Sequence, residues 1–174
     1  MDEDSSRGNG YLCDVCEKWE AAARITEQSD IRTVQLRTGV VLDKYGGALN
    51  KMLIPFKMGG GGILGDGKQY MSWIAMDDII QSIRYIIKNN SITGPVNLVA
   101  PNPVTNYEFT KTLGKVLHRP TFLPLPDFAA RLIFGEMADS LLLSSTRVNS
   151  KKLIEAGYKF KHEYLENALE DILK

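Results

Sequence analysis

Residues 36–80 read LRTGVVLDKYGGALNKMLIPFKMGGGGILGDGKQYMSWIAMDDII and indicate how the chain folds. The β-branched, largely apolar run at 34–42 is typical of a strand in a covered sheet. A short helix at 48–56 and a glycine-punctuated loop follow, and a second strand is expected at 69–74. Asp77 or the residue before it is expected to cap a helix rich in isoleucine. This order suits a loop that folds over a bound nucleotide and substrate.

The glycine-rich run at 59–67 is interpreted as a loop lining a site, and not as the primary phosphate anchor. Glycine amides can approach an anion closely. The run nevertheless matches neither strand–GxGxxG–helix nor GxxxxGK[ST], which are the arrangements that grip nucleotide phosphates. No such turn stands ahead of residue 36 either. We therefore expect the chain to lack an N-terminal glycine-rich nucleotide-binding motif.

The remaining pattern alternates strands with helices, which is typical of the α/β class. Apolar residues in 11–27 recur at helical spacing, which predicts a helix with one buried face. Thr105 and Glu108 form the capping-box pattern of a helix that runs to about residue 117. Further strands are expected at 95–99 and 121–125, and further helices at 126–134, 147–156 and 164–173.

Composition excludes several classes of protein. The chain has 174 residues, of which 44% are apolar and 24% charged, as in one ordinary globular domain. Lys plus Arg equals Asp plus Glu, at 21 each, so no overall charge favours nucleic acid or a membrane surface. Apolar runs such as 129–134 are too short to cross a bilayer, and residues 1–10 resemble no targeting signal. We expect a cytoplasmic protein, with any organelle signal lying in sequence upstream of this chain.

Cys13 and Cys16 form a CxxC motif, which suits redox chemistry or half of a zinc site. The zinc interpretation lacks a second ligand pair, because His118 and His162 are isolated in the sequence. Residue 16 also falls on the apolar side of its helix, which favours buried or partly buried thiols in a reducing compartment and no metal. His118 is expected to lie at a helix C-terminus, and His162 is expected to be solvated.

The other titratable candidates also favour structural roles. Asp77 and Asp78 are adjacent on a helix and do not face each other, so a cap and a first-turn charge explain them. Tyr11 is followed four residues later by Val15 and not by a lysine that would lower the pKa of its phenol. No catalytic residue is therefore assigned.

Several segments together resemble the epimerase-family atypical short-chain dehydrogenases, from Asp2 onward. They are WEAA at 19–22, LRTGVVLDKYGGAL, MSWIAMDDI, PVNLVAPNPVTNYEFTKTLGKVLHRP and FGEMADSLLL. The resemblance implies the C-terminal part of a Rossmann-like, doubly wound parallel sheet at 1–100, and a small mixed α/β lobe at 101–174. Family members carry a first βαβ unit ahead of this region, with the glycine-rich turn. Tight binding of NADP or NAD by this chain alone is therefore not expected.

The resemblance also implies where cofactor and substrate lie. By match to RTGVV, the strand end that meets the nicotinamide half of the cofactor comprises Thr38, Gly39, Val40 and above all Val41. On the side of an unknown small-molecule substrate, it implies Trp73 and the glycine loop with Gly62 and Gly65. The Tyr–Lys pair of the superfamily does not carry over. An alignment on Glu20 sets Leu12 and Cys16 at the two positions.

The implied function is that of an NAD(P)-dependent oxidoreductase or epimerase-like protein, with hydride transfer at the nicotinamide C4. The alternative is a non-catalytic scaffold or regulatory protein that retains the fold, which the absent Tyr–Lys pair favours. A sheet without its first strands exposes an edge and an apolar face. We therefore expect this chain to be marginally stable alone or to form a homodimer.

Overall fold

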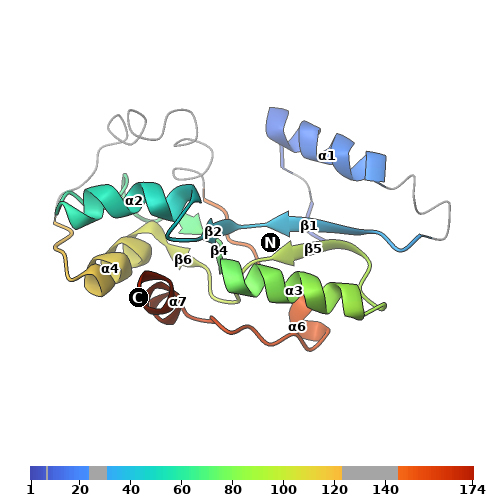
Figure 1. Ribbon diagram of the computed structural model, residues 1–174. Helices are drawn as coiled ribbons and strands as arrows, with labels where there is room; N and C mark the ends of the chain where they lie inside the picture. The colour runs from blue at the N-terminus through green and yellow to red at the C-terminus, as the bar shows by residue number, and fades with distance from the viewer. Residues whose placement is uncertain (7, 24–30, 123–144) are drawn as a thin grey trace.

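The computed structural model describes residues 1–6, 8–23, 31–122 and 145–174, in which short parallel strands lie among helices (Figure 1). Strand β1 (Val34–Thr38) runs parallel to β5 (Gly94–Leu98), and β2 (Val40–Leu42) runs parallel to β4 (Trp73–Ala75). Strand β3 (Tyr70–Met71) pairs antiparallel with β6 (Val104–Thr105). The α/β class and the strand expected near 95–99 are confirmed.

The long strand expected at 34–42 is divided at Gly39, where its pairing partner changes. The Gly39 N–H donates to Leu98 of β5, and the next amide, that of Val40, donates to the Ser72 carbonyl beside β4. A Cβ at position 39 would stand 2.6 Å from the Ser72 carbonyl oxygen and 2.8 Å from Val99 Cγ1. Only glycine lets the two backbones approach so closely. Gly39 is therefore the point at which the chain passes from pairing with β5 to pairing with β4.

The strand expected at 69–74 is likewise divided, into β3 and β4, and β4 separates two cores. Trp73 and Ile74 are adjacent and both fully buried, but successive strand residues point to opposite faces. Trp73 belongs to the core beneath α2, α4 and α7, and Ile74 to the core that includes Leu98 and Leu153. Each core draws on residues from both sides of position 100. The domain division expected there stays a prediction.

Four of the described helices have eight or more residues and pack around the strands, and most of their bounds follow the sequence pattern. They are α2 (Gly47–Lys57), α3 (Met76–Lys88), α4 (Asn106–Leu117) and α7 (Leu165–Leu173). In α4 the capping box is complete, since the Thr105 side chain accepts from the Glu108 amide and the Glu108 carboxylate accepts from Thr105. His118 lies at the C-terminal cap of α4, in a left-handed conformation with φ 54°. The cap expected for α3 is wrong, because Ala75 precedes the helix and no side chain caps it.

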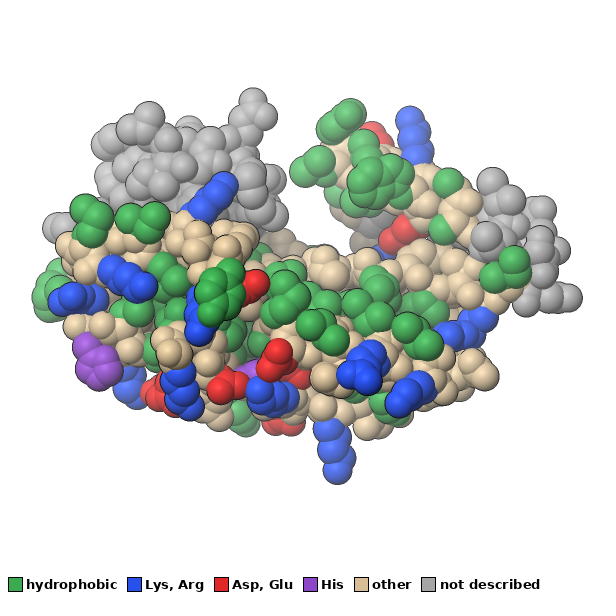
Figure 2. All heavy atoms as spheres, in the orientation of Figure 1, with side chains coloured by type: hydrophobic (Ala, Val, Ile, Leu, Met, Phe, Trp, Pro, Cys, Tyr) green, Lys and Arg blue, Asp and Glu red, His purple; other side chains and the backbone are tan. Residues whose placement is uncertain are grey.

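Helix α1 (Tyr11–Ala23) stands apart from the sheet and differs most from its prediction (Figure 1). None of its residues is buried, and Trp19 is 74% exposed. Hydrophobic side chains gather openly on this helix, and a second band crosses β1 and α3 (Figure 2). The expected buried face is wrong because no described segment packs against it. Because the helix is uncovered, its thiols are accessible: Cys16 is exposed and Cys13 is half-buried, and neither forms a disulfide.

The C-terminal part of the chain contains less helix than the sequence pattern predicts. The helix expected at 147–156 is only α6 (Lys151–Glu155). The residues before it are extended because Val148 donates to the Ser72 hydroxyl, which in turn donates to Thr146. Thr121 and Phe122 form no strand, and the rest of the strand and helix expected at 121–134 lies outside the described residues. No described helix has both the length and the apolar character that a membrane span requires.

Candidate functional site

The four residues expected at the cofactor lie together where β1 passes into β2. Thr38 ends β1 and is exposed, while Gly39, Val40 and Val41 are half-buried. Parallel strands present their carboxyl ends on one edge of a sheet, which is where ligands of open α/β sheets bind. In the described part of the chain, β2 is paired only with β4. The four residues are thus adjacent and at least partly accessible, and their contact with a cofactor stays a prediction.

The glycine run at 59–67 begins as a helix stop, and three of its amides already have acceptors within the chain. Its first glycine follows α2 with φ 79°, and the Gly59 and Gly60 amides donate to the carbonyls of Phe56 and Pro55. The Gly67 amide donates to Leu64. These N–H groups are occupied, so they are not available to a phosphate.

The substrate-side candidates lie in different surroundings. Gly62 lines a small apolar pocket of ≈ 50 Å³ between α2, the glycine loop and α4. Gly65 is exposed and has φ 56°, and it is not part of that lining. Trp73 is fully buried, and its indole N–H donates to the Asn102 carbonyl at 3.0 Å. The structure thus does not bring Trp73, Gly62 and Gly65 to one common surface.

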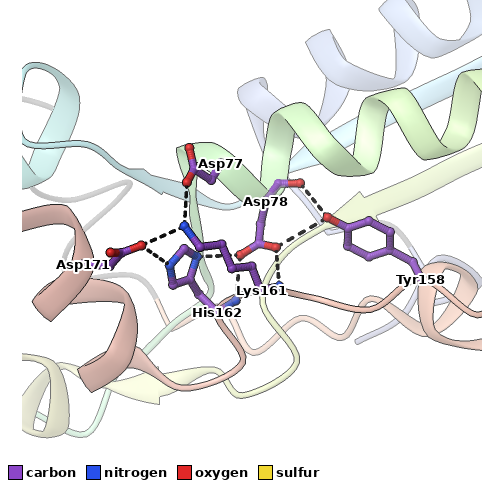
Figure 3. A network of polar contacts seen from close by, with 6 residues as sticks. All are labelled: Asp77, Asp78, Tyr158, Lys161, His162 and Asp171. Atoms are coloured by element: carbon purple, nitrogen blue, oxygen red, sulfur yellow. Dashed lines mark hydrogen bonds and ion pairs between the residues drawn. The ribbon is translucent and has the colours of Figure 1, made fainter.

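A buried carboxylate that sequence reasoning treated as ordinary organises the C-terminal segment (Figure 3). Asp78, in the first turn of α3, is 1% exposed. Its oxygens accept from the backbone amides of Lys161 at 2.8 Å and His162 at 3.0 Å, and from the His162 ring at 3.0 Å. Tyr158 donates to the Asp78 backbone carbonyl at 3.2 Å. Burial, and then the nearby Asp78 charge, raises the pKa of the Tyr158 phenol.

His162 is the centre of this cluster, and the expectation that it is solvated is wrong. Its Nδ1 faces Asp78 and its Nε2 faces Asp171 of α7 at 3.1 Å, so both contacts form together only when both ring nitrogens carry protons. Lys161 Nζ lies 2.8 Å from Asp171 and 3.0 Å from Asp77. The hydrogen bond from Lys161, and then that from His162, lowers the pKa of Asp171 to about 2. Hydrogen bonds to Asp171, and then to Asp77, raise the pKa of the Lys161 amine.

This cluster anchors the fold and is not an active site open to solution. The Asp78 and His162 side chains are 1% and 5% exposed, so a solute cannot reach the carboxylate–imidazole pair. The cluster ties α3 to the segment that leads into α7, which fixes the C-terminal part of the chain on the sheet (Figure 3). The sequence offered one signal, an aspartate pair after an apolar strand, but its partners lie 83 and 84 residues away.

Comparison with known proteins identifies relatives over nearly the whole chain. Residues 125–172 match a domain of unknown function, DUF1731. The epimerase family protein MT2273 of Mycobacterium tuberculosis is 45% identical over 169 residues, covering 97% of this chain and 56% of the relative. The mouse epimerase family protein SDR39U1 is 40% identical, covering 99% of this chain and 59% of the relative. The chain thus spans little more than half the length of these relatives.

Solved structures agree with the fold. The crystal structure of human epimerase family protein SDR39U1 (isoform 2) with NADPH has a TM-score of 0.91 and 38% identity, covering 99% of this chain and 58% of that one. The UDP-N-acetylglucosamine 4-epimerase of Bacillus cereus has a TM-score of 0.74 at 16% identity, which shows the fold alone. The Rossmann-like architecture expected from the sequence is therefore confirmed.

Proposed function

This chain belongs to the family of the epimerase family proteins, and on that premise we propose that it forms part of an NADP-dependent oxidoreductase or epimerase-like enzyme. NAD is the alternative cofactor. The observation that carries the proposal is the NADPH-bound human relative, whose structure follows 99% of this chain. A nicotinamide cofactor supplies hydride transfer when bound. Its substrate is proposed to be a small molecule of unassigned class.

The strand end at 38–41 is proposed to hold the nicotinamide half of the cofactor. Val40 and Val41 are half-buried and apolar, which suits a ring that must be oriented and shielded from water. Gly39 keeps the backbone close to β4, because any side chain there would meet the Ser72 carbonyl. Thr38 is exposed and carries a hydroxyl that can donate or accept a hydrogen bond. The chemistry of these residues therefore fits the proposed group.

The substrate side is proposed to include the glycine loop. Gly62 supports this because it lines an apolar pocket, to which Asn106 and Thr110 contribute polar side chains. Trp73 is proposed to act from within the core, as packing support for the strand end, since Val40 and Trp73 are register partners. Gly65 is proposed to give the loop its turn, through its left-handed backbone.

A non-catalytic scaffold is the second proposed function. Two observations favour it: the Tyr–Lys pair is absent from its usual place, and the Asp78–His162 pair is buried. Under this proposal the exposed hydrophobic side chains of α1 serve association, with a homodimer as the expected assembly. Tyr11, Leu12 and Trp19 are 79%, 62% and 74% exposed.

Titration with NADPH, followed by its fluorescence, tests the proposal. The chain is measured alone and joined to the N-terminal part of the human relative that it does not match. We expect tight binding only by the joined protein, and a loss of at least about tenfold in Val41→Asp, a change of about 1.4 kcal/mol. Leu36→Asp is the control, because Leu36 lies on β1 away from the strand end and is 41% exposed.

Absence of binding by both proteins would refute the oxidoreductase proposal and leave the scaffold. Equal losses of NADPH affinity in Val41→Asp and Leu36→Asp would refute only the assignment of the strand end to the nicotinamide. Sedimentation of the same samples reports the assembly, and a monomer at all concentrations would count against the homodimer.

A further inference from the structure

The CxxC motif lies on the exposed helix α1, in surroundings that differ from those its sequence predicts. Cys16 is exposed and Cys13 half-buried, and both are free thiols. No residue of α1 is buried. A buried helix would shield both thiols from redox partners, but α1 leaves Cys16 exposed.

The spacing of the two cysteines permits a bond between them. In an α-helix, residues three apart have Cα atoms about 5 Å apart, from a rise of about 4.5 Å and a radius of about 2.3 Å. Disulfides span Cα distances of about 4.4–6.8 Å. The Cβ atoms must approach by about 1–2 Å from their helical separation. Cys13 is the third residue of α1, where the backbone N–H has no helical partner, so a small shift there breaks little structure.

An arginine lies beside the motif. Arg37 of β1 binds both carboxylate oxygens of Glu20, each at 2.7 Å, and Glu20 is one helical turn beyond Cys16 on the same face. The hydrogen bond that Arg37 donates to Glu20 is the largest cause that raises the pKa of Arg37, and the electrostatic interaction with Cys16 is the smallest.

We propose that Cys13 and Cys16 form a redox-active dithiol that exchanges with small-molecule disulfides of the glutathione class. The Cys16 thiolate attacks one sulfur of the disulfide, whose S–S bond breaks and releases one thiol. The Cys13 thiolate then attacks the Cys16 sulfur, which releases the second thiol and leaves a Cys13–Cys16 bond. The protein loses two electrons and two protons, and the small disulfide gains both. Exposure assigns the first attack to Cys16. This site does not depend on the proposed function.

The test equilibrates the whole chain in glutathione buffers of increasing oxidation, blocks free thiols with an alkylating reagent and measures intact mass. We expect the wild type to lose both thiols together, with the mass of an internal disulfide and no retained glutathione. Cys13→Ser should stop at one glutathione adduct on Cys16. Cys16→Ser should react more slowly, because the remaining thiol is half-buried.

Circular dichroism of each variant checks that the helices remain. Because serine replaces cysteine at sites that are not buried, both variants should fold. Two results would overturn the proposal: a wild type that keeps both thiols in oxidised glutathione, or one that accumulates stable glutathione adducts in place of the internal bond.

Discussion

Replacing Asp78 with asparagine tests whether the buried cluster anchors the C-terminal segment. The carboxylate accepts the Lys161 and His162 amides and the His162 ring, and its side chain is 1% exposed. An amide of the same shape keeps one acceptor oxygen but turns an NH₂ group toward His162, where donors then face donors. Each buried donor left unpaired costs about 1–3 kcal/mol.

Because the backbone amide and the ring of His162 both lose their acceptor, we expect Asp78→Asn to lower the free energy of unfolding by about 2–6 kcal/mol. Asp77→Asn is the matched control, because Asp77 is the neighbouring residue, its side chain is 61% exposed, and its bond is to Lys161. An exposed ion pair contributes about 0–1 kcal/mol. Urea unfolding followed by circular dichroism measures both variants, with the slope m checked for constancy.

Losses in the two variants that agree within about 0.5 kcal/mol would refute the reasoning, because exposed sites typically change stability by that amount. Where Asp78→Asn does not fold, His162→Gln gives a second measurement. It removes one charge-assisted hydrogen bond and should cost about 1.5–3 kcal/mol.

Two further predictions follow from the strand crossing and from the exposed end of the cluster. Gly39→Ala should lower the free energy of unfolding by about 1–3 kcal/mol, because the new methyl meets the Ser72 carbonyl oxygen at 2.6 Å. Gly46→Ala, with no atom within 4 Å of its Cβ, should lose less than about 1 kcal/mol, and equal urea midpoints would contradict this. The pKa of Asp171 is lowered from 3.8 to about 2, so its stabilising effect is complete above pH 3.8 and is lost as the pH falls toward 2. The difference in urea midpoint between wild type and Asp171→Asn should shrink across that window, and a difference independent of pH would contradict the assignment.

The local elements of the fold could be predicted because their signals lie within a few residues of one another. Thr105 and Glu108 are three apart, and their reciprocal bonds form as the pattern indicates. The glycines after α2 stop that helix, as left-handed positions do. The strand expected at 69–74 and the helix expected at 147–156 were exceptions, and so was the single strand expected at 34–42. Its division at Gly39 depends on Ser72 and Val99, which the local pattern does not contain.

The candidate site could be predicted only in part. The strand end at 38–41 was located through a resemblance, and its contact with a cofactor stays a proposal. His162 could not be predicted, because a histidine between charged neighbours has the pattern of a solvated residue. Its burial depends on Asp78, which lies 84 residues away.

The sequence by itself determined the α/β class, the helices at 48–56, 105–117 and 164–173 to within a residue or two, and the capping box. These features follow from periodicity and from bonds between near neighbours, and both are present in the local sequence. The tertiary structure alone decided that Asp78 and His162 meet in the interior and that the apolar side of α1, with its two cysteines, is exposed. Burial depends on which surfaces pack together, and a helix has the same apolar stripe whether or not another segment covers it.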